Sequence, residues 1–209
     1  MFVDCPLPAS LTPVIPIDCP FRLDQIVKML FFQRSHGPFA TLASMKLLAT
    51  WSPMLASPGD ETTVVPTPIF ANLVIPDSAG KFVGGNDNTT FDGVPEYYGD
   101  TPVTITGEFK NLQPATKVLL DALSEYSFPS AVGKSNLAAM FVNKDGVIFH
   151  NNLNGFDIYN YRIGSRSSQG LYTPDLNKFS FDMKSDWDKA LASVVPTDFD
   201  ALVDLVNAA

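Results

Sequence analysis

Two histidines, His36 and His150, are the side chains of this sequence best suited to act as a general base near neutral pH. Neither belongs to an HExxH zinc motif, and no Ser or Cys stands in the turn context that activates a nucleophile. Acid–base catalysis also needs a partner that tunes the imidazole, and the sequence identifies none. We therefore predict that the protein is not an enzyme and has no catalytic residues.

Acidic residues and asparagines between positions 77 and 100 could supply oxygen ligands to Ca²⁺, a hard cation that binds several oxygens at once. The segment 87–92 does not alternate its ligands as an EF-hand loop does. These side chains also form Asx turns in solvated loops, which is the simpler interpretation. We predict no metal site and no cofactor. The residues concerned are Asp77, Asn86, Asp87, Asn88, Asp92, Glu96 and Asp100.

Cys5 and Cys19 are the only cysteines, and two thiols without a nearby histidine do not complete a four-ligand zinc site. The segment from Met1 to Pro20 has no basic start and is interrupted by prolines, so it does not resemble a signal peptide. No apolar stretch reaches the roughly 18 residues that a membrane span needs. We expect a soluble protein that is made in a cytoplasm. A disulfide between the cysteines is geometrically possible, but reduced thiols are expected in that compartment.

Several aromatic residues could form a platform on which a sugar stacks. Burial in the core of a sheet or in a subunit interface is the alternative interpretation. Trp187 directly follows an aromatic strand, and we expect it to anchor the corner there. The other candidates are Tyr97, Tyr98, Tyr159, Tyr161 and Tyr172.

The composition suits a domain with a large core and a surface of low charge. Hydrophobic residues make up 45% of the 209 positions and charged residues only 17%, below the roughly 25% of ordinary globular chains. A surface that neighbouring subunits bury has this composition, and so has a chain with a large ordinary core. The net charge is -8, and the bases are scattered, which disfavours tight binding of nucleic acid. We predict one β-rich structural domain over residues 1–209.

The sequence predicts helices in four places and leaves a fifth stretch open between helix and strand. A helix is expected from Leu23, ending near Arg34, because apolar residues there recur at helical spacing. The stretch 39–50 fits a helix or a buried strand, and a short helix is expected from Pro53 through Ala56. Further helices are expected over 114–126 and over 197–206.

Strands outnumber these helices. Alternating or β-branched runs predict strands within 62–76 and over 102–110, 137–142, 147–150, 156–163 and 177–184. The Asp-Gly pair within Asn143–Gly146 predicts a tight hairpin turn. Since no βαβ alternation is present, we predict a mainly β (α+β) fold: a β-sandwich or open barrel with flanking helices.

Residues 77–100 are predicted to form a long loop or an extended hairpin arm. The segment is rich in Gly, Asn and Asp, has little apolar periodicity, and ends in two adjacent tyrosines. Loops of this length in compact domains are usually functional or ordered by a partner. We expect the arm to become ordered against a neighbouring subunit. The candidate interface residues are Gly84, Gly85, Asn86, Asp87, Asn88, Tyr97 and Tyr98.

Several stretches together resemble virion structural proteins of tailed bacteriophages, particularly those that infect Bacteroidetes-type bacteria. They are Cys19-Pro20-Phe21-Arg22 with Gln25-Ile26-Val27 and Gln33-Arg34, Gly84-Gly85-Asn86-Asp87-Asn88-Thr89-Thr90, Phe179 to Asp188, and Pro196-Thr197-Asp198-Phe199. Within that group, the size and the long loop resemble a tail tube subunit. Such proteins carry a β-sandwich or barrel with a flanking helix and stack as rings.

This resemblance implies a location in the virion and a homo-oligomer, with rings expected, that also contacts other virion proteins. DNA would pass through the ring, and an acidic lumen would keep its phosphates from sticking. A neck protein, a head-tail connector and a capsid-decorating protein remain alternatives with the same composition. A carbohydrate-binding β-sandwich is the alternative from another class.

Overall fold

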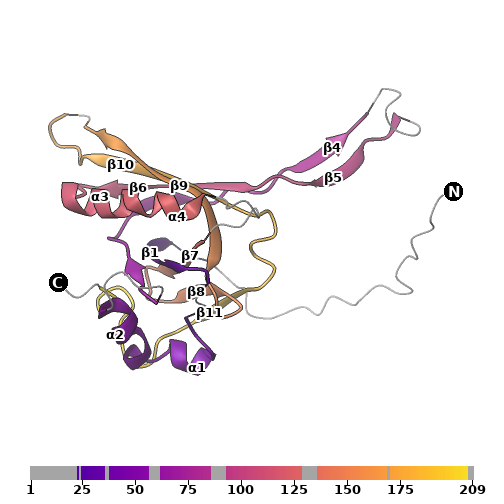
Figure 1. Cartoon of the computed structure of the whole chain (residues 1–209). Helices are drawn as coiled ribbons and strands as arrows, with labels where there is room; N and C mark the ends of the chain where they lie inside the picture. The colour runs from indigo at the N-terminus through magenta and orange to yellow at the C-terminus, as the bar shows by residue number, and fades with distance from the viewer. Residues whose placement is uncertain are drawn as a thin grey trace.

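The structure is a computed structural model that describes residues 23, 25–35, 38–56, 62–85, 93–128, 136–168 and 170–206. Figure 1 shows two layers of strands with helices beside them and a two-stranded arm that leaves the body. The strands are β1 Ile26–Gln33, β2 Val65–Pro66, β3 Ala71–Val74, β4 Gly80–Val83, β5 Glu96–Asp100, β6 Val103–Lys110, β7 Leu137–Asn143, β8 Ile148–Asn151, β9 Phe156–Ser167, β10 Leu176–Met183 and β11 Leu191–Val194. The helices are α1 Leu42–Met45, α2 Leu48–Ala56, α3 Pro114–Ala122 and α4 Ser124–Ser127.

The two layers are antiparallel sheets that share one strand. We call them the β1 sheet (β2, β1, β7, β8 and β11) and the β10 sheet (β9, β10, β6 and β3). The start of β9 pairs with β7, and the rest of β9 pairs with β10. Asn160 has a φ of 53°, in the left-handed region that Asn tolerates, where the pairing with β10 is irregular. The predicted β-sandwich with flanking helices is confirmed, and the sheets do not close into a barrel.

The predicted helix from Leu23 is wrong, because this segment forms strand β1. Its residues are buried on both faces of the sheet. Met29 and Phe31 face the core between the sheets, whereas Leu30 and Phe32 face the other side. Burial on both faces removes the alternation of apolar and polar residues that identifies a strand, and the remaining pattern resembled a helical one.

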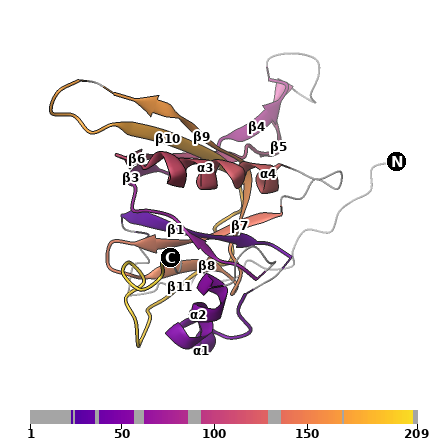
Figure 2. The ribbon, with the colours of Figure 1, turned by 60° about the vertical axis from the view of Figure 1, so that its left-hand side comes forward.

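The two faces of the β1 sheet lie against two separate cores. The first core lies between the sheets and is rich in phenylalanine: Phe141 stacks on Phe156 with ring centroids 5.0 Å apart, and Phe179 stacks on Phe181 at 6.3 Å. The second lies under the outer face of the β1 sheet, where α1, α2 and the C-terminal segment contribute Met45, Trp51, Leu55, Ala201 and Leu205. Figure 2 shows α1 and α2 on that outer side.

The hairpin predicted at Asn143 to Gly146 is confirmed. It joins β7 to β8, and the Asn143 side-chain oxygen accepts hydrogen bonds from the backbone of Asp145 at 3.0 Å and Val147 at 2.9 Å. Gly146 has a φ of 76°, which glycine adopts without strain. The predicted strands 102–110, 156–163 and 177–184 correspond to β6, β9 and β10.

Two helix predictions are corrected in detail. The stretch 39–50 is helical in part, since α1 and the start of α2 lie within it, and Pro53 lies inside α2 instead of at its start. The helix expected over 114–126 is two helices, α3 and α4, with Leu123 between them. The Ser127 hydroxyl of α4 accepts a hydrogen bond from the Tyr161 backbone at 2.9 Å, so α4 covers part of the edge of β9 that β7 leaves free.

The helix predicted over 197–206 is wrong, because this segment forms turns. The buried ammonium of Lys28 donates to the backbone carbonyls of Ala201 at 3.3 Å, Leu202 at 3.0 Å and Leu205 at 2.6 Å. A regular helix would use the first two carbonyls in its own ladder. The segment is docked, as expected, but a lysine from β1 holds it.

Candidate assembly surfaces

The most prominent surface feature is the arm formed by β4 and β5. These strands pair only with each other among the strands that the structure describes. Figure 1 shows them projecting from the body at the end where β6 begins. The sequence predicted a long loop or an extended hairpin arm over 77–100. The described residues 80–83 and 96–100 pair as a hairpin, and none of the described residues of the segment belongs to either core.

The arm exposes large apolar side chains to solvent. Phe82 is 62% exposed, Tyr97 59% and Tyr98 79%. The Phe82 and Tyr97 rings meet edge to face at 5.8 Å, which makes one aromatic face on the hairpin. A hydrogen bond to the Asp100 side chain is the main cause that raises the Tyr97 pKa. Exposed aromatic area of this kind on a projecting ribbon is typical of a surface that a partner covers.

The candidate interface residues lie on this arm as far as the structure describes them. Gly84 and Gly85 directly follow β4 with φ angles of 77° and 114°, conformations that other residues rarely adopt. A Cβ atom on Gly85 would lie 3.1 Å from the Pro95 ring, so the hairpin is also narrow there. Asn86, Asp87 and Asn88 lie outside the described residues.

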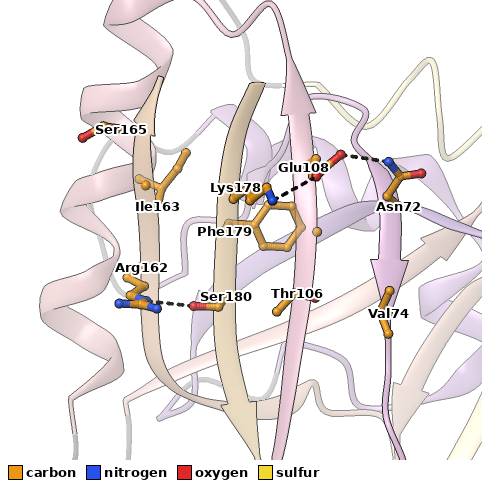
Figure 3. A pocket seen from close by; sticks show the side chains of 12 residues that line it. Asn72, Val74, Thr106, Glu108, Arg162, Ile163, Ser165, Lys178, Phe179 and Ser180 are labelled. Atoms are coloured by element: carbon orange, nitrogen blue, oxygen red, sulfur yellow. Dashed lines mark hydrogen bonds and ion pairs between the residues drawn. The ribbon is translucent and has the colours of Figure 1, made fainter. Parts of the chain in front are cut away.

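A second surface, which the sequence analysis did not identify, is a groove of about 690 Å³ on the outer face of the β10 sheet. We call it the outer groove. Side chains of β3, β6, β9 and β10 line it, as Figure 3 shows. Glu108 of β6 contacts Asn72 of β3 at 2.8 Å and Lys178 of β10 at 3.8 Å.

Arg162 lies in this groove without a carboxylate partner among the described residues. Its Nε donates to the Ser180 hydroxyl at 3.0 Å, as Figure 3 shows. The nearby carboxylate of Asp182 already accepts from Thr104 at 2.6 Å and from Asn160 at 2.8 Å. Arg162 and Lys178 outnumber Glu108, so the groove is positive in a chain of net charge -8.

The residues considered for catalysis do not form a site in the described structure. His150 is 1% exposed, its Nδ1 accepts from the Leu153 backbone at 3.1 Å, and its Nε2 finds no hydrogen-bond partner among the described residues. Burial lowers its pKa. His36 and both cysteines lie outside the described residues. Within the described ranges, no three His, Cys, Asp or Glu side chains gather as metal ligands.

The candidate sugar-stacking aromatics are not brought together. Tyr161 is buried against Phe31 at 5.2 Å, and Trp187 packs on Phe156 at 5.7 Å, where it anchors the corner after β10 as expected. Tyr172 is fully exposed in the β9–β10 loop, far along the chain from the tyrosines of the arm. In the same described ranges, no helix is long and apolar enough to span a membrane.

Comparisons with known proteins identify no family. No protein-family model matches the chain, and no curated protein matches it. A solved structure, the baseplate of the anti-feeding prophage, contains a chain that aligns over 88% of this chain and 100% of its own length. The sequence identity is 8% and the TM-score 0.33, a level at which the alignment assigns no function.

Proposed function

We propose that this protein is a structural subunit of a tailed-phage virion that assembles with copies of itself, as a tail tube subunit. The observation that carries the proposal is the arm, a two-stranded ribbon with exposed Phe82, Tyr97 and Tyr98 whose described residues belong to neither core of the body. A ribbon of this kind is a liability for a protein that works alone, because its exposed apolar area promotes association. For a subunit of an assembly, it is the contact surface.

The sequence resemblance to tailed-phage virion proteins supplies the class of assembly. The net charge of -8 supports a DNA conduit, since like charge keeps phosphates from binding to the wall. The protein would act in the virion, in rings that also contact other virion proteins, and it would have no enzymatic role. The carbohydrate-binding alternative gains no support, because the described structure does not gather its aromatics on one surface: Tyr161 is buried, and Tyr172 lies in the β9–β10 loop while Tyr97 and Tyr98 lie on β5.

The test is to compare the native chain with a variant in which two glycines replace residues 81–98. Gly80 pairs with Asp100 on the adjacent strand, so the two new glycines and Gly99 form a three-residue hairpin turn that closes the gap. The described arm residues lie outside both cores, so the variant keeps the native unfolding transition. Light scattering and negative-stain microscopy should show rings or tubes for the native chain and monomers for the variant. Native monomers, or rings formed by the variant, would contradict the proposal.

A further inference from the structure

The arm and the outer groove lie on opposite sides of the start of β6. Strand β5 runs back from the arm to the body, and after Thr101 and Pro102 the chain continues into β6, which forms part of the groove at Thr106 to Glu108. At about 3.4 Å per residue, this part of the groove lies roughly 10–17 Å beyond the start of β6. Figure 1 shows the arm pointing away from that side of the body. The arm therefore cannot reach the groove of its own chain.

The charges of the two surfaces are complementary. The described part of the arm carries Asp77, Glu96 and Asp100 against Lys81, a net charge of -2. The outer groove carries Arg162 and Lys178 against Glu108, a net charge of +1.

Among the described residues, the Ser180 hydroxyl is the hydrogen-bond partner of the Arg162 side chain, so its guanidinium can bind a carboxylate that another molecule supplies. Val74, which is 56% exposed at the margin of the groove, offers an apolar contact to an aromatic side chain.

The open edge of the β10 sheet is a poorer receptor than its face. Strand β3 is the last strand of this sheet, so an added strand would pair with it. However, Asn72 has a φ of 55°, and the register of β3 with β6 shifts between Ala71 and Val74. This irregularity interrupts the row of backbone groups that an added strand needs.

We propose that the arm of one subunit lies in the outer groove of a second copy, with arm carboxylates facing Arg162. This inference rests on the proposed self-assembly and names its receptor. The two surfaces differ, and the arm cannot reach the groove of its own chain, so the contact is heterologous. Each subunit then gives its arm to one neighbour and receives an arm from another. Repetition of such a contact produces a closed ring or an open filament, not an isolated dimer.

The first test reverses the charge in the groove. Arg162→Glu places a carboxylate opposite the acidic arm and should weaken association roughly 100-fold in light scattering. Lys144→Glu, the matched control, makes the same charge change at the exposed β7–β8 turn and should assemble as the native chain does. Arg162→Gln removes the positive charge without adding a negative one, so its association should be weaker than that of Lys144→Glu and stronger than that of Arg162→Glu. Native assembly by Arg162→Glu overturns the inference while leaving the proposed function intact.

The second test mixes two variants that cannot assemble alone. The chain in which two glycines replace residues 81–98 keeps a groove but has no arm, and Arg162→Glu keeps an arm but has a blocked groove. At the concentration at which the native chain assembles, sedimentation velocity should show a one-to-one complex that does not grow. The arm-less chain that also carries Arg162→Glu should form no complex with either variant. Absence of the one-to-one complex overturns the inference, whereas assembly by the arm-less chain alone overturns the proposed function.

Discussion

Replacing Lys28 with methionine should change how the stability of the fold depends on pH. Lys28 is 3% exposed, and its ammonium contacts three backbone carbonyls of the C-terminal segment. Burial lowers the Lys28 pKa from 10.5 to about 8, although Asp200 and Asp204 partly offset this effect. In the unfolded chain the pKa returns to 10.5, so the unfolded state holds more protons between these two values.

The difference between the Lys28 pKa values in the native and unfolded states sets the direction and the size of this pH dependence. Below pH 8 the native state holds a buried charge at a cost, and the cost falls as pH rises from about 8 to 10.5. The unfolding free energy of the native chain should therefore increase with pH in this window. At about 1.4 kcal/mol per pKa unit, the full gain is about 3 kcal/mol.

Urea unfolding between pH 7.5 and pH 10 measures this contribution from Lys28. The upper limit of pH 10 avoids the titration of Tyr161, because burial raises the pKa of its phenol. Above pH 10 the unfolded chain releases this proton while the native state keeps it, so the unfolding free energy falls again. Lys28→Met should lose the rise that the native chain shows, and the control Lys144→Met, at an exposed position, should retain it. Parallel pH profiles for the native chain and Lys28→Met would refute the reasoning.

Three further predictions concern the body of the fold. Gly107→Ala should lower the unfolding free energy by about 2 kcal/mol in urea, because the new Cβ would lie 2.3 Å from the Phe179 ring; an unchanged transition would show that the ring moves freely. Asn160→Ala should cost about 1 kcal/mol in the same assay and Asn160→Gly less, because the φ of 53° suits glycine; equal losses would contradict a backbone origin. Burial lowers the His150 pKa, so thermal stability should fall as pH drops below 6.5, and His150→Gln should remove this part of the fall.

The sequence predicted elements that carry a clear local signal. Strand β6 has alternating burial, and the turn at Asn143 has side-chain chemistry that specifies it, so both were predicted correctly. Strand β1 was mistaken for a helix because both of its faces are buried. The C-terminal turns were mistaken for a helix because their stabilising donor, Lys28, lies more than 170 residues away in sequence. Local patterns do not contain such long-range contacts.

The same difference between local patterns and long-range contacts explains why the sequence predicted one of the two surfaces and not the other. The arm was predicted because Gly-rich composition and adjacent tyrosines are local features of residues 77–100. The outer groove was not predicted, since it forms only when β3, β6, β9 and β10 lie side by side. The sequence signal for the groove was the alternating polar residues of each strand, such as Lys178 and Ser180 in β10. Such residues indicate a solvent-facing side of a strand but do not indicate which strand lies next to it.

The central claim is that copies of this protein meet through the arm, and hydrogen exchange tests it most directly. Amide exchange should be measured by mass spectrometry on the native chain as a dilute monomer and as an assembly. We predict that backbone amides of β4 and β5 exchange rapidly in the monomer and become protected in the assembly, whereas amides of the buried strands β1 and β7 are protected in both. Equal exchange of the arm amides in both states, or a chain that stays monomeric, would contradict the account.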